Sequence, residues 1–387
     1  MTMPAPRPDR RPRDFGAAAE VLEQAVRAGA FPGTVILVAQ GGEIVWHAAF
    51  GHRSLDPERM PMRPDMVFDL ASLTKPLATT VALMRLVRDG KVRLDDRITR
   101  FVPNFGVHGK THVTIRQVLC HASGLAAWRP FFKDVQKDAR HGRLNYMGSQ
   151  GARQTVYERI HRERLEYDPG TRAVYSDLGF ILLGELIELL SHASLDRVCH
   201  DRIFRPLGLG ATGFVDLSKL RVQKLVPVTE MIAPTERCPW RGKVLCGEVH
   251  DDNAWAIGGV AGHSGLFSTA MDVHTLLARL RACLHGDDDF LPAALVREMW
   301  TRETSVPGST WALGWDTPSA TGSSAGARVS RHAVGHLGFT GTSVWVDLER
   351  DAHVVFLTNR VHPTRNNEKI REVRPRIHDA IWAALDA

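Results

Sequence analysis

The two ends of the chain carry segments that look like partners in one sheet. Near the start, the stretch GTVILVAQGGEIVWHAAFG has an apolar run at residues 35–38, a turn at Gly41-Gly42 and a second apolar run at residues 44–46. Near the end, TSVWVDLERDAHVVFLTN repeats the pattern of strand, polar turn and strand. Because such patterns indicate β-hairpins, we predict one antiparallel sheet built from both termini. A helix is expected to follow the second hairpin and to start near Pro375, since proline is favoured in a first helical turn.

The sequence between the hairpins is mostly typical of helices. Stretches such as GFILLGELIELLSHASLDRVCHDRIF are apolar and helical in pattern, and proline and glycine separate them. We therefore predict an α/β fold with a disordered basic tail over residues 1–14. The sheet domain is expected to comprise residues 15–80 and 255–387, with a mainly helical inserted region over residues 81–254.

Composition narrows the class of protein. A chain of 387 residues with 44% hydrophobic residues can bury a sizeable core. No apolar run is long enough for a membrane span, and the N-terminal stretch MTMPAPRPDRRPRDFG has no apolar signal-peptide region, so we expect a cytoplasmic protein with no membrane partner. The five cysteines are irregularly spaced, which favours reduced thiols. The net charge of +6 comes from dispersed arginines, so no nucleic-acid partner is predicted, and no oligomeric state is predicted either.

A serine and a lysine three residues apart stand in the stretch FDLASLTKPLATTVALMRL. The apolar residues that follow recur at helical spacing, which predicts a helix. Ser72 and Lys75 would then share a face near the helix N-terminus, where backbone N–H groups favour negative charge. The alternative is that Ser72 is a helix cap and Lys75 a solvated side chain, because S-x-x-K is common by chance.

Four further stretches favour the catalytic interpretation of Ser72 and Lys75 over the helix-cap alternative. They are LCHASGLAAWRP, YDPGTRAVYSDLGFILLGELIE, HDDNAWAIGGVAGHSGLFSTA and GHLGFTGTSVWVD. Together with ASLTKPL, they resemble in order and spacing the class C beta-lactamase and penicillin-binding-protein superfamily of serine hydrolases. The resemblance extends over nearly the whole chain, from about residue 30 to about residue 360.

The resemblance implies a beta-lactamase/transpeptidase-like fold, in which helices flank an antiparallel sheet and the active site lies beside an inserted helical region. Ser72 and Lys75 match the family's S-x-x-K motif, and Tyr175 matches the tyrosine of its Y-x-N motif. The HLG at residues 336–338 matches the third motif, which is usually K-T-G and sometimes H-x-G.

These residue types suit acyl transfer through a serine. The Ser72 hydroxyl needs a base, either neutral Lys75 or the phenolate of Tyr175, and we expect their pKa values to be lowered by each other's charge or by burial. Tyr175 would return the proton to the leaving group. The resemblance implies an oxyanion hole formed by the backbone N–H groups of Ser72 and Phe339. Gly338 would let the strand backbone approach the substrate.

Two implied substrate-binding residues depart from the lactamase pattern. Asp177 stands where asparagine is usual; its carboxylate can only accept hydrogen bonds and is expected to pair with Lys75, although it could instead cap the following helix. His336 replaces a lysine, and an ordinary histidine pKa of about 6.5 makes it neutral above neutral pH. A preference for carboxylate-bearing substrates is therefore expected to fade between about pH 6 and about pH 8.

Both departures favour esters or amides other than penicillins. The first hypothesis is a serine hydrolase with esterase activity, followed by a muropeptide amidase or D-amino-acid peptidase, and then a class C beta-lactamase. A non-catalytic penicillin-binding-like sensor is the alternative from another class. The predicted partner is a small ester, amide or muropeptide. No cofactor is predicted, and no metal, because His250, Asp251, Asn253 and His263 look metal-like but fit no standard zinc spacing.

Overall fold

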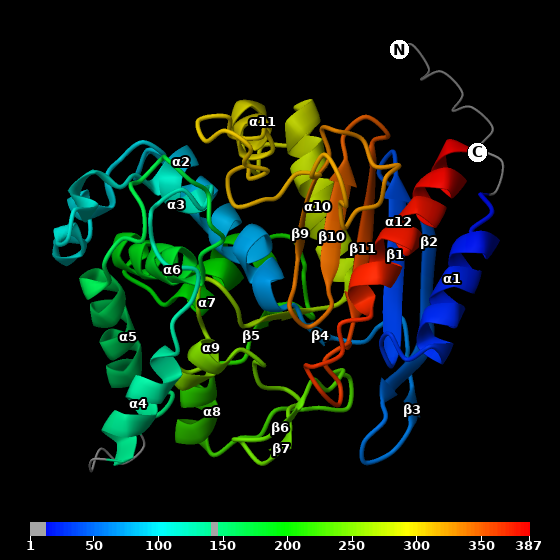
Figure 1. Cartoon of the computed structure of the whole chain (residues 1–387), viewed down its shortest axis with the longest axis horizontal. Helices are drawn as coiled ribbons and strands as arrows, with labels where there is room; N and C mark the ends of the chain where they lie inside the picture. Colours follow the sequence, from blue (N-terminus) through cyan, green and yellow to red (C-terminus); the bar gives the residue numbers. More distant parts are fainter. Residues whose placement is uncertain (1–12, 141–145) are drawn as a thin grey trace.

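A computed structural model describes residues 13–140 and 146–387. Six strands form its main sheet: β1 (Gly33–Gln40), β2 (Glu43–Ser54), β3 (Met60–Pro61), β9 (Val334–Leu337), β10 (Ser343–Asp347) and β11 (Ala352–Thr358). Their spatial order is β3, β2, β1, β11, β10, β9, and all neighbours run antiparallel (Figure 1). Strands β1 and β11, from opposite ends of the chain, lie side by side in the centre, which confirms the sheet predicted from the two hairpins.

The apolar run in β1 is buried on both faces of this sheet. Because side chains alternate along a strand, Val35 and Leu37 enter the large core that the sheet shares with the helical region, whereas Ile36 and Val38 enter a smaller core on the other face. All four side chains are fully buried. A strand covered on both faces has no polar face, which explains the unbroken run in the sequence.

Helices cover both faces of the sheet. Helix α10 (Ala270–His285) packs on one face and contacts β1 and β11, whereas α1 (Gly16–Arg27) and α12 (Ile370–Asp386) pack together on the other (Figure 1). The remaining helices are α2 (Val81–Arg88), α3 (Ile115–Leu119), α4 (Phe131–Arg140), α5 (Gln150–Arg162), α6 (Asp177–Ser191), α7 (Leu195–Cys199), α8 (Leu217–Gln223), α9 (Asp252–Ala256) and α11 (Ala293–Met299). This arrangement is the antiparallel sheet flanked by helices that the resemblance implied.

Short strands connect the helical region to the sheet side. Strands β4 (Phe68–Asp69), β8 (Leu266–Ser268) and β5 (Gly213–Phe214) form a small sheet, and β6 (Arg237–Cys238) pairs with β7 (Lys243–Val244). The large core runs without a break from Val35 in the sheet to residues of α6 and α10. The division into a sheet domain and an inserted region at residues 81–254 stays a proposal.

The helix predicted from Ser72 is not regular. A 3₁₀ turn spans Ala71–Leu73, a π-helical segment spans Lys75–Thr80, and α-helical geometry begins only with α2 at Val81. Pro76 explains the interruption, because it has no N–H to donate to the carbonyl four residues earlier.

The start of the last helix differs from expectation. Helix α12 begins at Ile370, so Pro375 lies inside the helix and not at its start. The first turn is held by the burial of Ile370 and Arg374 against the sheet, which offsets the one hydrogen bond that proline removes. At the other end of the chain, Arg13 donates to the carbonyl of Ala384 at 3.2 Å, and the tail boundary at residue 14 stays a proposal. Residues 1–12 of that tail lie outside the described residues.

Within residues 13–140 and 146–387, no single helix has the length and apolar composition to cross a membrane; a bent pair, Asp177–Ser191 with Leu195–Phe204, meets those criteria jointly.

Candidate active site

The turn that carries Ser72 is held by a buried aspartate. Asp69 ends β4, and its Oδ1 accepts from the N–H of Ala71 at 2.9 Å while its Oδ2 accepts from the N–H of His250 at 2.7 Å. Ala71 has a φ of 48°, a left-handed conformation that costs free energy for a residue other than glycine. The two hydrogen bonds of Asp69 therefore hold a strained turn that presents Ser72.

Lys75 is the centre of a compact polar cluster. Its side chain is fully buried, and its Nζ donates to Ser72 Oγ at 3.1 Å, to Tyr175 OH at 2.5 Å and to Asp177 Oδ1 at 2.7 Å. The carbonyl of His263 lies 3.1 Å from the same nitrogen. Ser72, Lys75, Tyr175 and Asp177 are thus brought together from two separate segments of the chain, and the His263 carbonyl comes from a third.

The protonation states in this cluster differ from the expected ones. Burial lowers the pKa of Lys75, but the Asp177 carboxylate and Tyr175 more than offset it, and the pKa is raised. Burial also raises the pKa of Tyr175, although Lys75 opposes the shift. The prediction of lowered pKa values is therefore wrong, because it omitted the carboxylate that stabilises the ammonium. The resting cluster holds a charged lysine and a neutral phenol.

Asp177 does not cap its helix. The cap of α6 is Ser176, whose hydroxyl accepts from the N–H of Gly179 at 3.2 Å, and Asp177 is the first helical residue. The Asp177 side chain is then free to pair with Lys75, as expected from its position, and the capping alternative is wrong.

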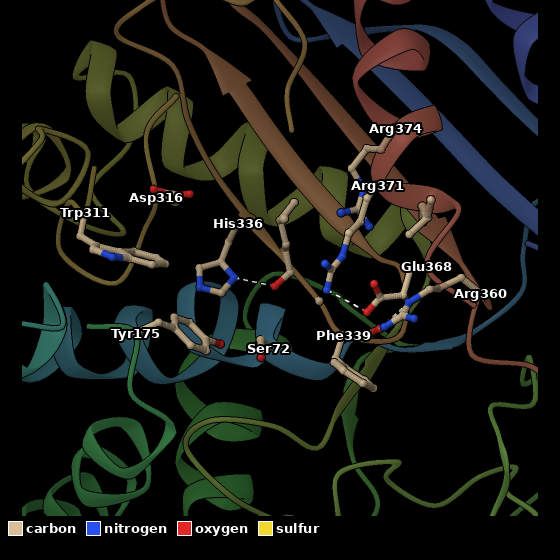
Figure 2. Close-up of a pocket in the computed structure, with 13 residues that line it drawn as sticks. Ser72, Tyr175, Trp311, Asp316, His336, Phe339, Arg360, Glu368, Arg371 and Arg374 are labelled. Carbon is tan, nitrogen blue, oxygen red and sulfur yellow. Dashed lines mark hydrogen bonds and ion pairs between the residues drawn. The ribbon is translucent and has the colours of Figure 1, made fainter. Parts of the chain in front are cut away.

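His336 lies on the strand side of the cluster, in β9. Its ring packs against Tyr175 and Trp311, with ring centroids 5.9 and 5.8 Å away, and its Nδ1 donates to the carbonyl of Leu337 at 2.8 Å (Figure 2). Burial, with the nearby Lys75 charge, lowers the pKa of His336 to about 3. The expectation that it becomes imidazolium near pH 6 is therefore wrong, since burial and the Lys75 charge both disfavour the imidazolium and no carboxylate pairs with the ring among the described residues.

The loop after β9 brings a backbone amide to the cluster. A Cβ on Gly338 would lie 2.0 Å from Thr342 Oγ1 and 2.5 Å from the Leu70 carbonyl, so only glycine fits this approach to the Ser72 turn. The carbonyl of Phe339 accepts from Arg360 Nε at 3.0 Å, and among the described residues nothing accepts the Phe339 N–H. Phe339 lines the same cavity as Ser72, so its amide stays the predicted second oxyanion donor.

Two cavities meet at Ser72. One, of about 430 Å³, extends to Trp311, Asp316 and His336 and to a group of arginines near α12 (Figure 2). The other, of about 320 Å³, extends to Trp128 and to a group of acidic and histidine side chains. Ser72, Tyr175 and Phe339 line both cavities, so a bound molecule that fills both would pass directly over the serine hydroxyl.

The residues that looked metal-like do not form one set of ligands. His250 Nε2 pairs with Glu236 at 3.1 Å, and Asn253 is buried and bonded to the backbone of Arg129 and Phe132. Asp251 and His263 do meet, with Oδ1 and Nε2 2.9 Å apart.

A family model described as Beta-lactamase matches residues 18–376 of the chain. The chain belongs to the beta-lactamase family. This is a family of serine hydrolases, so the predicted family, fold and general class of enzyme are confirmed at that level.

Named relatives and solved structures point to different members of the family. A protein of Escherichia coli (strain K12) named "Putative D-alanyl-D-alanine carboxypeptidase" is 32% identical over 88% of this chain and 81% of its own length. An octameric penicillin-binding protein homologue from Pyrococcus abyssi has a TM-score of 0.68 at 22% identity, covering 89% of this chain and 73% of that one. EstCE1, a hydrolase with promiscuous acyltransferase activity, also has a TM-score of 0.68 at 22% identity, covering 93% and 97%.

Several residues of this beta-lactamase-family site were missed in the sequence. Asp69 had a readable signal, because a short acidic residue just before a tight turn often bonds to the turn backbone. Arg360 and Arg374 had none, since they are distant in sequence from every motif and reach the cavity only through the packing of β11 and α12.

Proposed function

We propose that the chain is a serine hydrolase that forms an acyl-enzyme at Ser72. The observation that carries this proposal is the position of Lys75 Nζ, within hydrogen-bond distance of Ser72 Oγ, Tyr175 OH and Asp177 Oδ1 at once. A side chain in that position can pass protons among all three groups, which a nucleophilic serine requires.

The charged state of Lys75 sets the order of the proton transfers. Because the ammonium cannot take a proton at rest, it passes one to Asp177 as it receives the proton of Ser72 Oγ, and the alkoxide attacks the substrate carbonyl. The developing oxyanion accepts from the N–H groups of Ser72 and Phe339. Tyr175 then protonates the leaving group and is reprotonated through Lys75 from Asp177. Water enters by the same steps in reverse and releases the acyl group.

We further propose that the leaving group carries a carboxylate. Arg374 is 6% exposed and donates to the Gly341 carbonyl at 2.9 Å, while its Nε has no acceptor among the described residues. Among the described residues, Arg360 donates only to backbone carbonyls, those of Phe339, Arg365 and Asn367. Burial and the neighbouring Arg360 lower the pKa of Arg374 to about 9. In the described part of the chain neither buried guanidinium is hydrogen-bonded to a carboxylate, and Glu368 acts on Arg360 only through its charge, which favours an anionic ligand in the cavity that the arginines line.

Acids in the same cavity do not fill that role. Glu368 pairs with the exposed Arg371 at 2.9 Å, and Asp316 bridges to Trp311 on another part of the cavity wall. This leaves the arginines for substrate, which supports a carboxypeptidase-type reaction on peptide-like substrates. The name of the Escherichia coli relative supports the same proposal.

Simple esterase activity is the second candidate. It is favoured by the apolar part of the arginine-lined cavity, where Trp311, Leu337, Phe339 and Ile370 offer contacts to an uncharged acyl or alkyl group. The hydrolase EstCE1 shares the fold, but at 22% identity it supports no more than that.

The test begins with covalent labelling. A fluorophosphonate should label the wild type and should not label Ser72→Ala, because acylation of the serine is common to every substrate. Peptide substrates with a free C-terminal carboxylate should then be turned over at least about tenfold faster than the matching methyl amides.

Substitution of one arginine separates the two candidates. Arg374→Gln should remove the preference for the carboxylate, whereas Arg376→Gln, on the exposed side of the same helix, should keep it. Equal turnover of carboxylate and methyl-amide substrates by the wild type would favour the esterase. Labelling that persists in Ser72→Ala would contradict the acyl-enzyme itself.

A further inference from the structure

The second cavity at Ser72 is acidic where the first is basic. Apart from Ser72, Tyr175 and Phe339, its lining includes three aspartates, Asp177, Asp251 and Asp252, with Arg365 the only arginine or lysine among the residues that line it. The two cavities therefore place opposite charges on a substrate path that crosses the serine.

One of these carboxylates has no lysine or arginine partner. Lys75 neutralises Asp177, and Arg241 and Arg365 pair with Asp252 at 2.8 and 3.5 Å. Asp251 accepts only from His263 Nε2 and from the N–H of Ala254 in the described part of the chain. The pKa of Asp251 is lowered, because burial, which raises it, is outweighed by His263 and the backbone donor, so the group is a carboxylate.

Two buried polar atoms at this cavity also lack partners. His263 is 1% exposed and Ser264 is 3% exposed, both line the cavity, and neither His263 Nδ1 nor Ser264 Oγ has a partner among the described residues. His263 Nε2 donates to the Asp251 carboxylate, which leaves Nδ1 as the ring nitrogen without a protein partner. Buried polar atoms are rarely left without partners, so a ligand with hydrogen-bonding groups fits here.

One ammonium group can reach both carboxylates of this cavity. A carboxylate oxygen of Asp177 and one of Asp251 lie within 4.8 Å of each other. Two acceptors at a hydrogen-bond distance of about 2.9 Å from an N–H₃⁺ in tetrahedral directions stand about 4.7 Å apart, so one ammonium can bridge the pair. The exposed rings of Trp128 and Phe339, 43% and 49% accessible, border the same cavity and can contact the substrate beside the cation.

We propose that this acidic cavity binds a primary ammonium group on the acyl part of the substrate. The inference rests on the proposed acyl-enzyme at Ser72 and adds to it a substrate class: molecules with an amine on the acyl side and a carboxylate on the leaving side. Asp251 is the principal partner of the ammonium, and Asp177 and His263 complete its surroundings.

The test uses two esters that share a neutral leaving group and differ only at the end of the acyl chain, which carries a primary amine in one and its acetamide in the other. In buffer with EDTA, the wild type should hydrolyse the amine ester with a kcat/KM about tenfold higher or more, the size expected for a charge-assisted hydrogen bond. Asp251→Ser should bring that ratio close to one, and serine retains the helix cap.

A matched control makes the same change elsewhere. Asp216 caps α8 as Asp251 caps α9, so Asp216→Ser removes a capping carboxylate away from the site and should leave the ratio unchanged. Thermal unfolding of both variants shows whether Asp251→Ser is folded. If it is not folded, the wild-type ratio of kcat/KM for the amine ester to kcat/KM for the acetamide ester decides whether the ammonium site exists.

Each other outcome overturns the inference. A wild-type ratio near one, with Ser72 labelled normally, would contradict the ammonium site and leave the acyl-enzyme proposal intact. A preference that appears only when EDTA is omitted would mean that a metal ion occupies the acceptors. A preference that survives in folded Asp251→Ser would place the amine elsewhere. Loss of all turnover and labelling would refute the proposed function first.

Discussion

Lys75 and His336 are two basic residues buried against the same tyrosine, yet Lys75 is positively charged and His336 is neutral. Lys75 Nζ lies 4.6 Å from the centre of the Tyr175 ring, and the His336 ring centroid lies 5.9 Å from it. Burial lowers the pKa of Lys75, but Asp177 and Tyr175 together outweigh it and the pKa is raised, whereas burial lowers the pKa of His336 to about 3. Burial disfavours both positive charges, and only Lys75 has a carboxylate 2.7 Å away that favours its charged form.

A second histidine agrees with this comparison. His121 is buried with its ring centroid 4.7 Å from that of Tyr175, and its Nδ1 accepts from the N–H of Ser176 at 3.0 Å. Burial lowers its pKa well below the ordinary value, and the charge of Lys75 adds to the effect. The site thus holds one paired cation, Lys75, and two neutral imidazole rings, one from β9 and one from the segment that follows α3.

The largest effect should follow from breaking the helix side. Lys75→Met and Tyr175→Phe should each lower kcat by about two orders of magnitude or more, because each removes a proton-transfer partner. The double variant should be little slower than either single variant, since the two residues act in one relay. Stopped-flow or steady-state kinetics with one ester substrate measure the two single variants and the double variant. A double variant slowed by the product of the two single effects would show that the residues act independently.

Removing the carboxylate tests the cause of the difference directly. Asp177→Asn removes the carboxylate that raises the pKa of Lys75 and that accepts its proton in the relay. Maximal kcat should fall by about tenfold, because the final proton acceptor is lost. In the variant, a neutral Lys75 must itself take the proton of Ser72, so kcat should rise with pH through the pKa of the lysine. A variant profile without that rise would mean that Lys75 is not the base, and an unchanged kcat would remove Asp177 from the relay.

The smallest effect belongs to the strand side. Because His336 stays neutral, the preference for carboxylate over neutral substrates should be constant between about pH 6 and about pH 8, in the wild type and in His336→Gln. A ratio that falls across this range in the wild type alone would restore a charged role for His336.

The substitution His336→Gln should also change how the free energy of unfolding depends on pH. The folded pKa of His336, about 3, lies below the value of about 6.5 in an unfolded chain, so the unfolded state binds more protons and stability is lost as the pH falls below 6.5. At pH 5.5 the wild type loses about 1.4 kcal/mol of its free energy of unfolding in this way. His336→Gln has no such loss, so the difference in stability between the variant and the wild type should shift by that amount in the variant's favour from pH 7.5 to pH 5.5. Urea unfolding of both proteins at the two pH values measures the difference; equal pH dependence would mean that His336 is protonated in the folded protein.

The sequence was informative wherever a local pattern has one physical outcome. The two hairpins predicted the central sheet, since apolar runs around a tight turn pair in few other ways. The spacing of Ser72 and Lys75 predicted that their side chains meet, and they do so although the helix between them is interrupted at Pro76. Asp177 in the place of asparagine predicted the pair with Lys75.

Charge states and distant partners were decided only by the tertiary structure. Whether Lys75 is charged depends on how far burial and Asp177 offset each other, and that balance requires distances that residues far apart in sequence acquire only on folding. For the same reason the sequence does not reveal the arginines near α12, nor that Asp251 has no lysine or arginine partner in the described part of the chain, because a charge is unusual only in relation to what surrounds it. By itself the sequence determined the family, the sheet and the residues that meet at Ser72. Packing decided which of them carry charge and what kind of substrate they can face.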